Sequence, residues 1–269
     1  CHSGNHKMII CFSGTGNSAA VASRLSVLLD DESLVLLRGE ILTGEKPALT
    51  LKGERIIWVF PTYSWGVPPV VADFIGRVEI AGADNVPHFM VTTCGDDIGR
   101  TDRMWQRLIG MRGWSTAGRW SVRMPNTYVC MKGFDVDSKR VEREKLGAMP
   151  SRVADIAGAI IGRPDAVDVE TGSWAWIKTK LIYPWFRRYA MSSKSFRVSD
   201  ACIGCGACER GCPTENIRLN AGTKRPEWDD NCALCLHCYH YCPTNAIAYG
   251  KNTGGKGQYR CPDDAHVQG

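Results

Sequence analysis

Two runs of four cysteines near the end of the chain have a spacing that suits metal chemistry. Residues 202–217 read CIGCGACERGCPTENI and residues 232–247 read CALCLHCYHYCPTNAI, so the cysteines, proline, threonine and final isoleucine recur thirty residues apart. Three thiolates on one tight loop can each reach a different iron of a cubane cluster, while a fourth cysteine before proline points elsewhere and ligates a partner cluster. The spacing therefore predicts two 4Fe-4S clusters in one small domain with internal pseudo-twofold symmetry.

Each predicted cluster takes three ligands from one run and the fourth from the other run. The predicted ligands are Cys202, Cys205, Cys208 and Cys242 for the first cluster, and Cys232, Cys235, Cys238 and Cys212 for the second. A pair of structural zinc sites is the alternative, with His237 and His240 nearby, but zinc ribbons use paired CxxC knuckles rather than triplets with a displaced fourth cysteine. These two histidines are expected to be solvated surface residues.

A phosphate-binding pattern lies near the start of the chain. Two glycines let the backbone curl, hydroxyl groups offer donors, and a helix N-terminus follows, which together favour a bound phosphate. The predicted contacts are Ser13, Gly14, Thr15, Gly16, Asn17 and Ser18. The residues from Gly14 to Ala19 also fit the dinucleotide fingerprint GxGxxA, but that fingerprint expects an acidic residue after the second strand, where this chain has Arg38.

Two further loops carry groups that suit a flavin. Tyr63 and Trp65 can offer a flat face to an isoalloxazine ring, and the turn at Cys94-Gly95 can offer backbone N–H groups to its pyrimidine edge. The predicted contacts are Pro61, Thr62, Tyr63, Ser64, Trp65, Gly66, Thr93, Cys94, Gly95 and Asp96. Ordinary loop packing is the alternative for the two aromatic residues. The third loop, CGDDIG, has no aromatic residue, so one face of the flavin is expected to be open.

These loops are positioned by alternating strands and helices. Continuous apolar runs at 8–12, 34–37, 55–60 and 88–93, with a fifth strand within 114–124, are typical of strands buried on both faces. Helices are expected at 18–29, 70–78, 100–112 and 138–161. The alternation predicts a doubly wound α/β fold with a parallel five-stranded sheet, in which ligand loops gather at the carboxyl ends of the strands.

The three loops resemble the FMN site of the flavodoxin family, and the cysteine runs resemble bacterial-type two-cluster 4Fe-4S ferredoxins, which are small α+β domains. The whole arrangement resembles the fused flavodoxin and ferredoxin proteins of anaerobic microbes. This resemblance implies FMN and two 4Fe-4S clusters as cofactors. The expected organisation is a flavodoxin-like FMN-binding domain at 8–165, a basic aromatic linker at 166–197, a ferredoxin domain at 198–250 and a C-terminal tail at 251–269.

The linker combines aromatic and basic residues. From Trp174 to Arg197 there are six Lys or Arg and no acidic residue, and Pro184 is expected to interrupt any helix. We expect the aromatic face to pack between the domains. Docking to a membrane surface or an acidic partner through 174–197 is the alternative.

The composition of the chain excludes several other classes of protein. With 269 residues, 44% hydrophobic and 23% charged, the chain is typical of a globular protein, and it has no run of 18 apolar residues. The net charge of +5 is offset because each oxidised cluster with its thiolates carries about two negative charges and a flavin phosphate about two more. A nucleic-acid partner therefore loses its main support. No secretory signal is recognised, so a cytoplasmic location is expected.

The leading hypothesis is a low-potential electron carrier that serves an unidentified redox partner. Clusters accept one electron at a time whereas a flavin can hold two, so such a chain can collect electrons singly and deliver them in pairs. The first alternative is a flavin-dependent reductase that acts directly on a small substrate at the open flavin face. The second is a zinc-stapled adaptor that binds a phosphate ligand. No catalytic residue is assigned, and self-association is left open.

Overall fold

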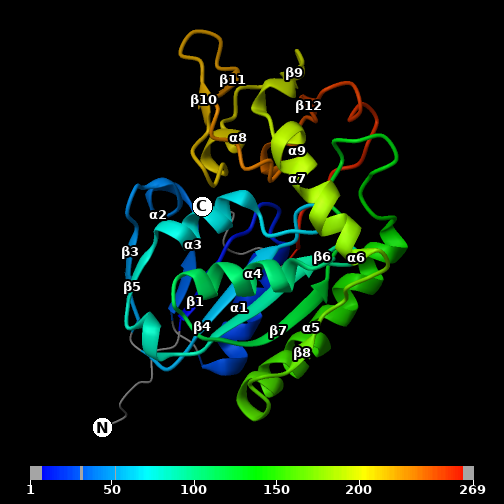
Figure 1. The fold of residues 1–269 in the computed structure, drawn as a ribbon. Helices are drawn as coiled ribbons and strands as arrows, with labels where there is room; N and C mark the ends of the chain where they lie inside the picture. Colours follow the sequence, from blue (N-terminus) through cyan, green and yellow to red (C-terminus); the bar gives the residue numbers. More distant parts are fainter. Residues whose placement is uncertain (1–7, 31–32, 52, 263–269) are drawn as a thin grey trace.

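The computed structural model describes residues 8–30, 33–51 and 53–262, and its first two-thirds is built on one parallel sheet (Figure 1). The strand order is β2-β1-β4-β6-β7-β8, and every neighbouring pair is parallel. The strands are β1 (Met8–Cys11), β2 (Ser33–Leu36), β4 (Ile56–Pro61), β6 (His88–Cys94), β7 (Thr116–Arg123) and β8 (Val167–Asp168). The first five follow the order 2-1-3-4-5, which is the flavodoxin-like order. The two-residue strand β8 extends the expected five-stranded sheet.

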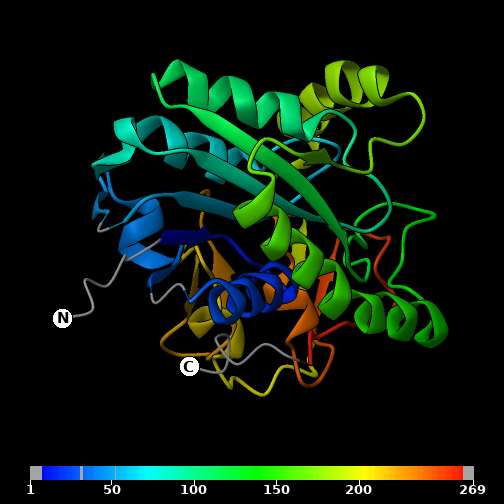
Figure 2. The ribbon, with the colours of Figure 1, turned by 90° about the horizontal axis from the view of Figure 1, so that it is seen from below.

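Two layers of helices cover the sheet (Figure 2). Helices α1 (Asn17–Leu29) and α5 (Lys139–Gly162) pack on one face, where alternate β1 residues such as Ile9 and Cys11 are buried against them. Helices α3 (Pro69–Arg77) and α4 (Thr101–Met111) pack on the other face, against Ile10 and its neighbours. Because both faces are buried, the loops at the strand ends are the exposed part of the sheet where a ligand can bind.

Shorter elements complete this part of the chain. Helix α2 (Gly39–Thr43) follows β2, and strands β3 (Ala48–Thr50) and β5 (Glu79–Ala81) form a separate parallel pair beside the 3₁₀ turn η1 (Ala83–Asn85). No helix in the described part of the chain has the length and apolar character needed to cross a membrane.

The C-terminal cysteine-rich part is a small α+β unit with an internal repeat. Strand β9 (Phe196–Val198) pairs with β12 (Ile247–Tyr249), and β10 (Ile217–Leu219) pairs with β11 (Pro226–Trp228), both antiparallel. Helices α8 (Ala207–Arg210) and α9 (His237–His240) are also thirty residues apart. Each strand and helix of the first copy thus has its partner thirty residues later, which is the pseudo-twofold arrangement expected from the sequence.

The backbone repeats this symmetry in detail. Gly204 and Gly206 have φ values of 66° and 75°, and the equivalent Leu234 and Leu236 have φ values of 50° and 61°. Glycine adopts this left-handed conformation at no steric cost, whereas leucine does not. The second run therefore keeps the loop shape of the first although its residues are larger.

The segment between the two parts is helical, which corrects the expectation that Pro184 would interrupt a helix. It runs through α6 (Ala175–Ile177), a π-helical segment η2 (Lys178–Ile182), α7 (Tyr183–Trp185) and a second π-helical segment η3 (Phe186–Ala190), followed by the 3₁₀ turn η4 (Ser193–Ser195). Proline lacks the N–H that an α-helical turn needs. π-Helical turns, with their i→i+5 hydrogen bonds, precede and follow Pro184 and accommodate it in the helix. Tyr183 and Phe186 are buried, as expected for a packed linker, but the other large side chains of this segment are not.

After the cysteine-rich unit the chain returns to the sheet domain. Tyr259 and Cys261 are buried in the core beside α1 and α5. The Tyr259 hydroxyl donates to Asn17 Oδ1 at 2.7 Å, close to the start of α1. This part of the expected tail is therefore packed, while residues 263–269 lie outside the described residues.

Candidate functional site

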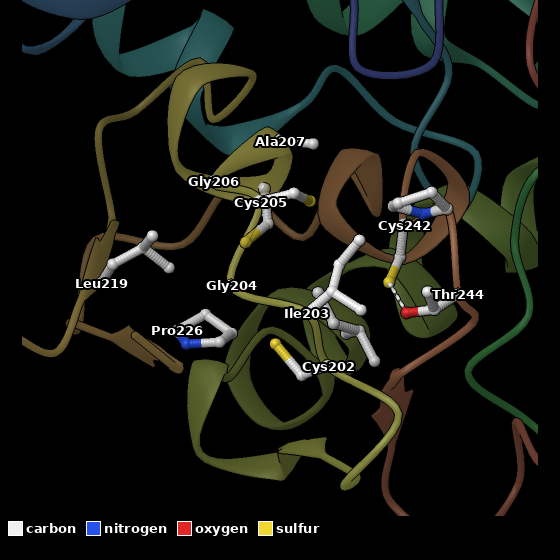
Figure 3. Close-up of a pocket in the computed structure, with 13 residues that line it drawn as sticks. Cys202, Ile203, Gly204, Cys205, Gly206, Ala207, Leu219, Pro226, Cys242 and Thr244 are labelled. Atoms are coloured by element: carbon white, nitrogen blue, oxygen red, sulfur yellow. Dashed lines mark hydrogen bonds between the residues drawn. The ribbon is translucent and has the colours of Figure 1, made fainter. Parts of the chain in front are cut away.

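The four thiols predicted to hold the first cluster line a single small cavity of about 20 Å³ (Figure 3). Cys202, Cys205 and Cys208 come from the first run, and Cys242 comes from the second run. In the described residues, no three Cys, His, Asp or Glu side chains converge as ligands of a single metal ion would. The thiols instead surround a volume, which is the arrangement that a polynuclear cluster requires.

The four thiols of the second set also lie near one another. Burial raises the pKa of the Cys232 thiol to about 11, and the neighbouring Cys212 adds to the shift. Burial raises the pKa of Cys238 well above 9.0, with further contributions from Cys235, Cys232 and Cys212. These buried thiols stay protonated without a metal, so binding of a cluster must displace their protons.

Backbone N–H groups point at several of these sulfurs. The Ala246 N–H donates to Cys242 Sγ at 3.2 Å, and the equivalent Asn216 N–H donates to Cys212 Sγ at 3.3 Å. The Leu234 N–H donates to Cys232 Sγ at 3.3 Å. Such bonds stabilise negative charge on thiolates and help to set the reduction potential of a bound cluster.

The predicted phosphate loop, residues 13–18, lies between β1 and α1. Gly16 takes a φ of 95° at the start of the helix, and its N–H donates to Ser13 Oγ at 3.2 Å. Within the described residues, the N–H groups of Thr15, Asn17 and Ser18 meet no protein acceptor. N–H groups at a helix N-terminus that find no acceptor in the described part of the chain suit a bound phosphate. The loop at residues 13–18 therefore fits the flavin phosphate that the sequence implies.

The other two predicted loops meet this one at the carboxyl edge of the sheet. Ser18 Oγ lies 2.8 Å from Thr93 Oγ1, which joins the first and third loops. In the second loop, Tyr63 and Gly66 exchange two backbone hydrogen bonds, with Ser64 at a φ of 45° and Trp65 at 62°. Turns of this kind usually contain glycine or asparagine, and strained backbone of this sort concentrates at functional sites.

The segment that precedes the cysteine-rich unit holds the aromatic loop in place. Lys178 Nζ lies 5.0 Å from the centre of the Trp65 ring and pairs with Asp97 at 2.6 Å. The Thr179 hydroxyl donates to the Trp65 carbonyl at 2.8 Å, and the Tyr183 hydroxyl donates to the Val67 carbonyl at 2.6 Å. Sequence reasoning missed these contacts because they join residues more than eighty positions apart.

Asp96 and Asp97 differ in their surroundings. Asp96 is exposed and lies 3.8 Å from Lys145 Nζ, whereas Asp97 is paired with Lys178 at 2.6 Å and also accepts the Gly99 N–H at 3.0 Å. Beside them, Gly95 lies against the Asn126 amide, which is held by Asp137 and in turn by Lys145. Hydrogen bonds from Asn126 and Lys145 hold the pKa of Asp137 low although burial opposes this. The Asn126 group was not foreseen, since nothing in its spacing marks it.

The cysteine-rich unit sits directly over the phosphate loop. A methyl group added to Gly14 would lie 2.6 Å from Cβ of Cys235, so only glycine permits this approach. His237 Nδ1 donates to the Gly14 carbonyl at 2.9 Å, and His240 Nε2 donates to the Thr127 carbonyl at 2.7 Å. The expectation that these two histidines are solvated is wrong: they are 3% and 0% exposed, because they form the contact between the two domains.

The contact continues at the end of β2. Arg38 donates to the Arg210 carbonyl at 2.9 Å, and the Gly39 N–H donates to the Pro213 carbonyl at 2.9 Å. A cavity of about 30 Å³ lies beside the phosphate loop, and Arg38 and His237 are among its lining residues. The cation Arg38 therefore stands where a dinucleotide site would need a carboxylate, which disfavours the dinucleotide alternative.

Comparison with known proteins identifies the cysteine-rich part. Residues 201–247 match the family model of the 4Fe-4S dicluster domain. The chain is also 38% identical over 72 residues to the formate dehydrogenase iron-sulfur subunit of Haemophilus influenzae and to the formate dehydrogenase-O iron-sulfur subunit of Escherichia coli. These matches cover 23% of this chain and only 22% and 23% of those proteins, so the chain spans about a quarter or less of the curated relatives.

Two solved structures align with about half of the chain at low TM-scores. A putative flavoprotein from Bacteroides uniformis aligns with a TM-score of 0.35 and 15% identity, covering 52% of this chain and 97% of that chain. The flavodoxin of Streptococcus pneumoniae aligns with a TM-score of 0.32 and 15% identity, covering 56% of this chain and 98% of that chain. The flavodoxin-like class of the sheet rests on its own strand order.

Fold and site together define an iron-sulfur redox protein with a flavodoxin-like sheet and a 4Fe-4S dicluster domain. The chain therefore fits a flavodoxin/ferredoxin fusion, as the sequence motifs indicated. Its iron-sulfur domain supports a role in electron transfer.

Proposed function

We propose that this protein is a low-potential electron carrier that holds two 4Fe-4S clusters and one FMN and exchanges electrons with an external redox protein. The clusters would supply one-electron chemistry, and FMN would supply the capacity to hold a pair of electrons. The thiols assigned above would hold the clusters, and the three loops at the carboxyl edge of the sheet would hold FMN. Thiolate ligands are maintained in a reducing compartment, which supports a cytoplasmic location.

The observation that carries the proposal is the contact between Cys235 and Gly14. A predicted cluster ligand touches the predicted phosphate loop, with no other residue between them. Tyr63, in the aromatic loop, also lies close to this run: burial raises its pKa well above 10.0, and Cys235 and Cys232 add to the shift. Because this contact holds a predicted cluster loop against a predicted flavin loop in one chain, the two sites would not have to meet by diffusion.

The two cysteine runs differ in solvent exposure, and this difference supports a proposal for which cluster receives electrons from outside. Ile203 of the first run is 67% exposed, whereas the equivalent Ala233 of the second run is 5% exposed and packs into the core of the sheet domain. Cys205 is exposed as well. We infer that the first run faces the external partner and that the second run faces the flavin loops.

The test begins with anaerobically purified holoprotein, in which we expect about eight irons and one FMN per chain. A reduced ferredoxin serves as the protein donor and dithionite as a small reductant, and flavin absorbance is followed with both. The Cys205→Ser variant should lose most flavin reduction by the protein donor and retain reduction by dithionite. Equal rates with the donor in both proteins, or iron without FMN, would show that the proposal is wrong.

One observation favours the reductase alternative: the loop at residues 93–99 contributes no aromatic side chain to the site. A flavin face left without an aromatic cover is accessible to a small substrate. The two functions differ because a reductase reoxidises its own reduced flavin with a small molecule, whereas a carrier needs a protein acceptor. Reoxidation of the reduced holoprotein by small quinones or nitroaromatics, at rates independent of any added protein, would favour the reductase.

A further inference from the structure

An exposed stripe of large apolar side chains runs along the helical segment between the two domains. Trp174, Leu181, Trp185 and Tyr189 are 76%, 59%, 49% and 69% exposed. Leu181, Trp185 and Tyr189 are spaced four residues apart, so they share one helix face, and the rings of Trp185 and Tyr189 lie 6.3 Å apart. Scattered apolar residues on a surface are ordinary, but a contiguous aromatic stripe marks an interaction site.

The stripe is not the face by which the segment packs on the protein. Tyr183 and Phe186 point inward and are buried, and the Tyr183 ring lies against Gly66. The segment therefore has a second apolar face that the described part of the chain leaves uncovered. In Figure 2 the segment lies at the edge of the molecule, where an extended surface can reach it.

The charged side chains of the segment itself are all positive. Lys180, Arg187 and Arg188 are exposed, and residues 171–198 contain no aspartate or glutamate. Acidic groups of other elements that act on the segment in the described part of the chain include Asp97, which is paired with Lys178, and Asp73, which acts on Tyr183. The outer surface of the segment is therefore cationic as well as aromatic.

We propose that this segment, residues 174–190, attaches the protein to the surface of a membrane that contains anionic lipid. Tryptophan and tyrosine favour the level of the lipid headgroups, and amphipathic helices with basic flanks bind anionic lipid surfaces without crossing the bilayer. The stripe would sit at the boundary between headgroups and acyl chains, and Lys180, Arg187 and Arg188 would contact anionic headgroups. This inference does not depend on the proposed electron-carrier function.

The test is co-sedimentation of the anaerobic holoprotein with vesicles of phosphatidylcholine alone and with added phosphatidylglycerol. We expect binding to the anionic vesicles that weakens in high salt. The paired substitution Arg187→Gln with Arg188→Gln should weaken binding about thirtyfold, because each cation near the surface contributes about a factor of five. Trp185→Ser with Tyr189→Ser should weaken it by about tenfold or more.

Val27→Ser is the control, because Val27 is an apolar side chain that is 82% exposed and lies on α1, away from the stripe in the sequence. Arg187, Arg188 and Val27 are exposed, so their variants should keep nearly the wild-type melting temperature, and the Trp185→Ser/Tyr189→Ser variant is used at a temperature where it is folded. The proposal is overturned if the holoprotein binds neither kind of vesicle, or if the stripe variants bind as the control does. Failure to bind vesicles together with retention on poly-glutamate resin, lost in the Arg187→Gln/Arg188→Gln variant, would show that the surface fits an acidic protein instead.

Discussion

His237 Nδ1 lies 2.9 Å from the carbonyl oxygen of Gly14, although the two residues are 223 positions apart. The imidazole also stacks on Tyr241, with ring centres 4.1 Å apart and an angle of 9° between the planes. His237 is the residue directly before Cys238, and Gly14 is in the predicted phosphate loop. One side chain thus fixes the distance between a predicted cluster loop and a predicted flavin loop.

Substitution of His237 by Phe should loosen this contact while keeping the ring stacked. The Gly14 carbonyl would lose its donor in a buried position, which costs about 1–3 kcal/mol. We expect the melting temperature of the holoprotein to fall by several degrees in differential scanning calorimetry. Tyr189→Phe is the control: it removes a polar atom from an exposed ring and should leave the melting temperature unchanged. A melting temperature equal to that of the wild type would mean that the His237 bond contributes nothing to docking.

Substitution of Gly14 by Ala should separate the two domains at their closest point. The new methyl group would overlap both Cβ and the carbonyl oxygen of Cys235, and overpacking of this kind costs about 1–3 kcal/mol. We expect lower FMN content and loss of iron from the cluster that Cys235 holds. Gly110→Ala is the control, because a methyl group there meets nothing within 4 Å and should stabilise α4 slightly. Full retention of FMN and iron in the Gly14→Ala protein would show that Gly14 and Cys235 are not in close contact.

The crossed ligand assignment can be tested with paired cysteine substitutions. If Cys205 and Cys242 hold the same cluster, the double variant Cys205→Ser/Cys242→Ser should keep about four irons, because only one cluster is damaged. The variant Cys205→Ser/Cys212→Ser should damage both clusters and keep few irons. Iron analysis and EPR of the reduced proteins distinguish the two results. Equal iron in both double variants would rule out the crossed pairing.

Much of the fold was predictable because its signals are local. The apolar run at Met8–Cys11 has the continuous character of a strand buried on both faces, and Ser138 caps α5 by accepting the Val141 N–H, close to the predicted helix start. The cysteine runs were also informative, since their spacing alone reflects the geometry of a cluster. Strand β8 was missed because two residues carry too little periodicity to be recognised.

The contact between the domains could not be predicted in the same way. His237 and His240 lie within the second cysteine run. The spacing of that run predicts the role of its cysteines, but it does not indicate that both imidazoles are buried against another domain. Their partners are the backbone carbonyls of Gly14 and Thr127, and every residue type carries a carbonyl. Pro184 was misjudged for a related reason, because tertiary packing of Tyr183 and Phe186 holds a helix that local propensity disfavours.

His88 is fully buried in the core of the sheet domain. Its Nδ1 accepts a hydrogen bond from Trp58 Nε1 at 3.1 Å, and its Nε2 donates to the Ala83 carbonyl at 3.1 Å, so the neutral ring is fully satisfied. Burial lowers the pKa of His88 from 6.5 to about 4, although the Ala83 bond and Asp84 oppose the shift. The unfolded chain therefore takes up a proton at this residue in a range of pH where the folded protein does not.

The sign of the pH dependence follows from that difference. Stability from His88 is fully present above pH 6.5 and is lost as pH falls from 6.5 towards about 4, by at most about 1.4 kcal/mol per pH unit. A Gln at this position can accept from Trp58 and donate to Ala83 but does not titrate. We therefore expect the difference in free energy of unfolding between wild type and His88→Gln, measured by urea denaturation, to shrink as the pH is lowered through this window. Other buried histidines are common to both proteins and cancel in the comparison, so parallel pH profiles would show that His88 is not held neutral.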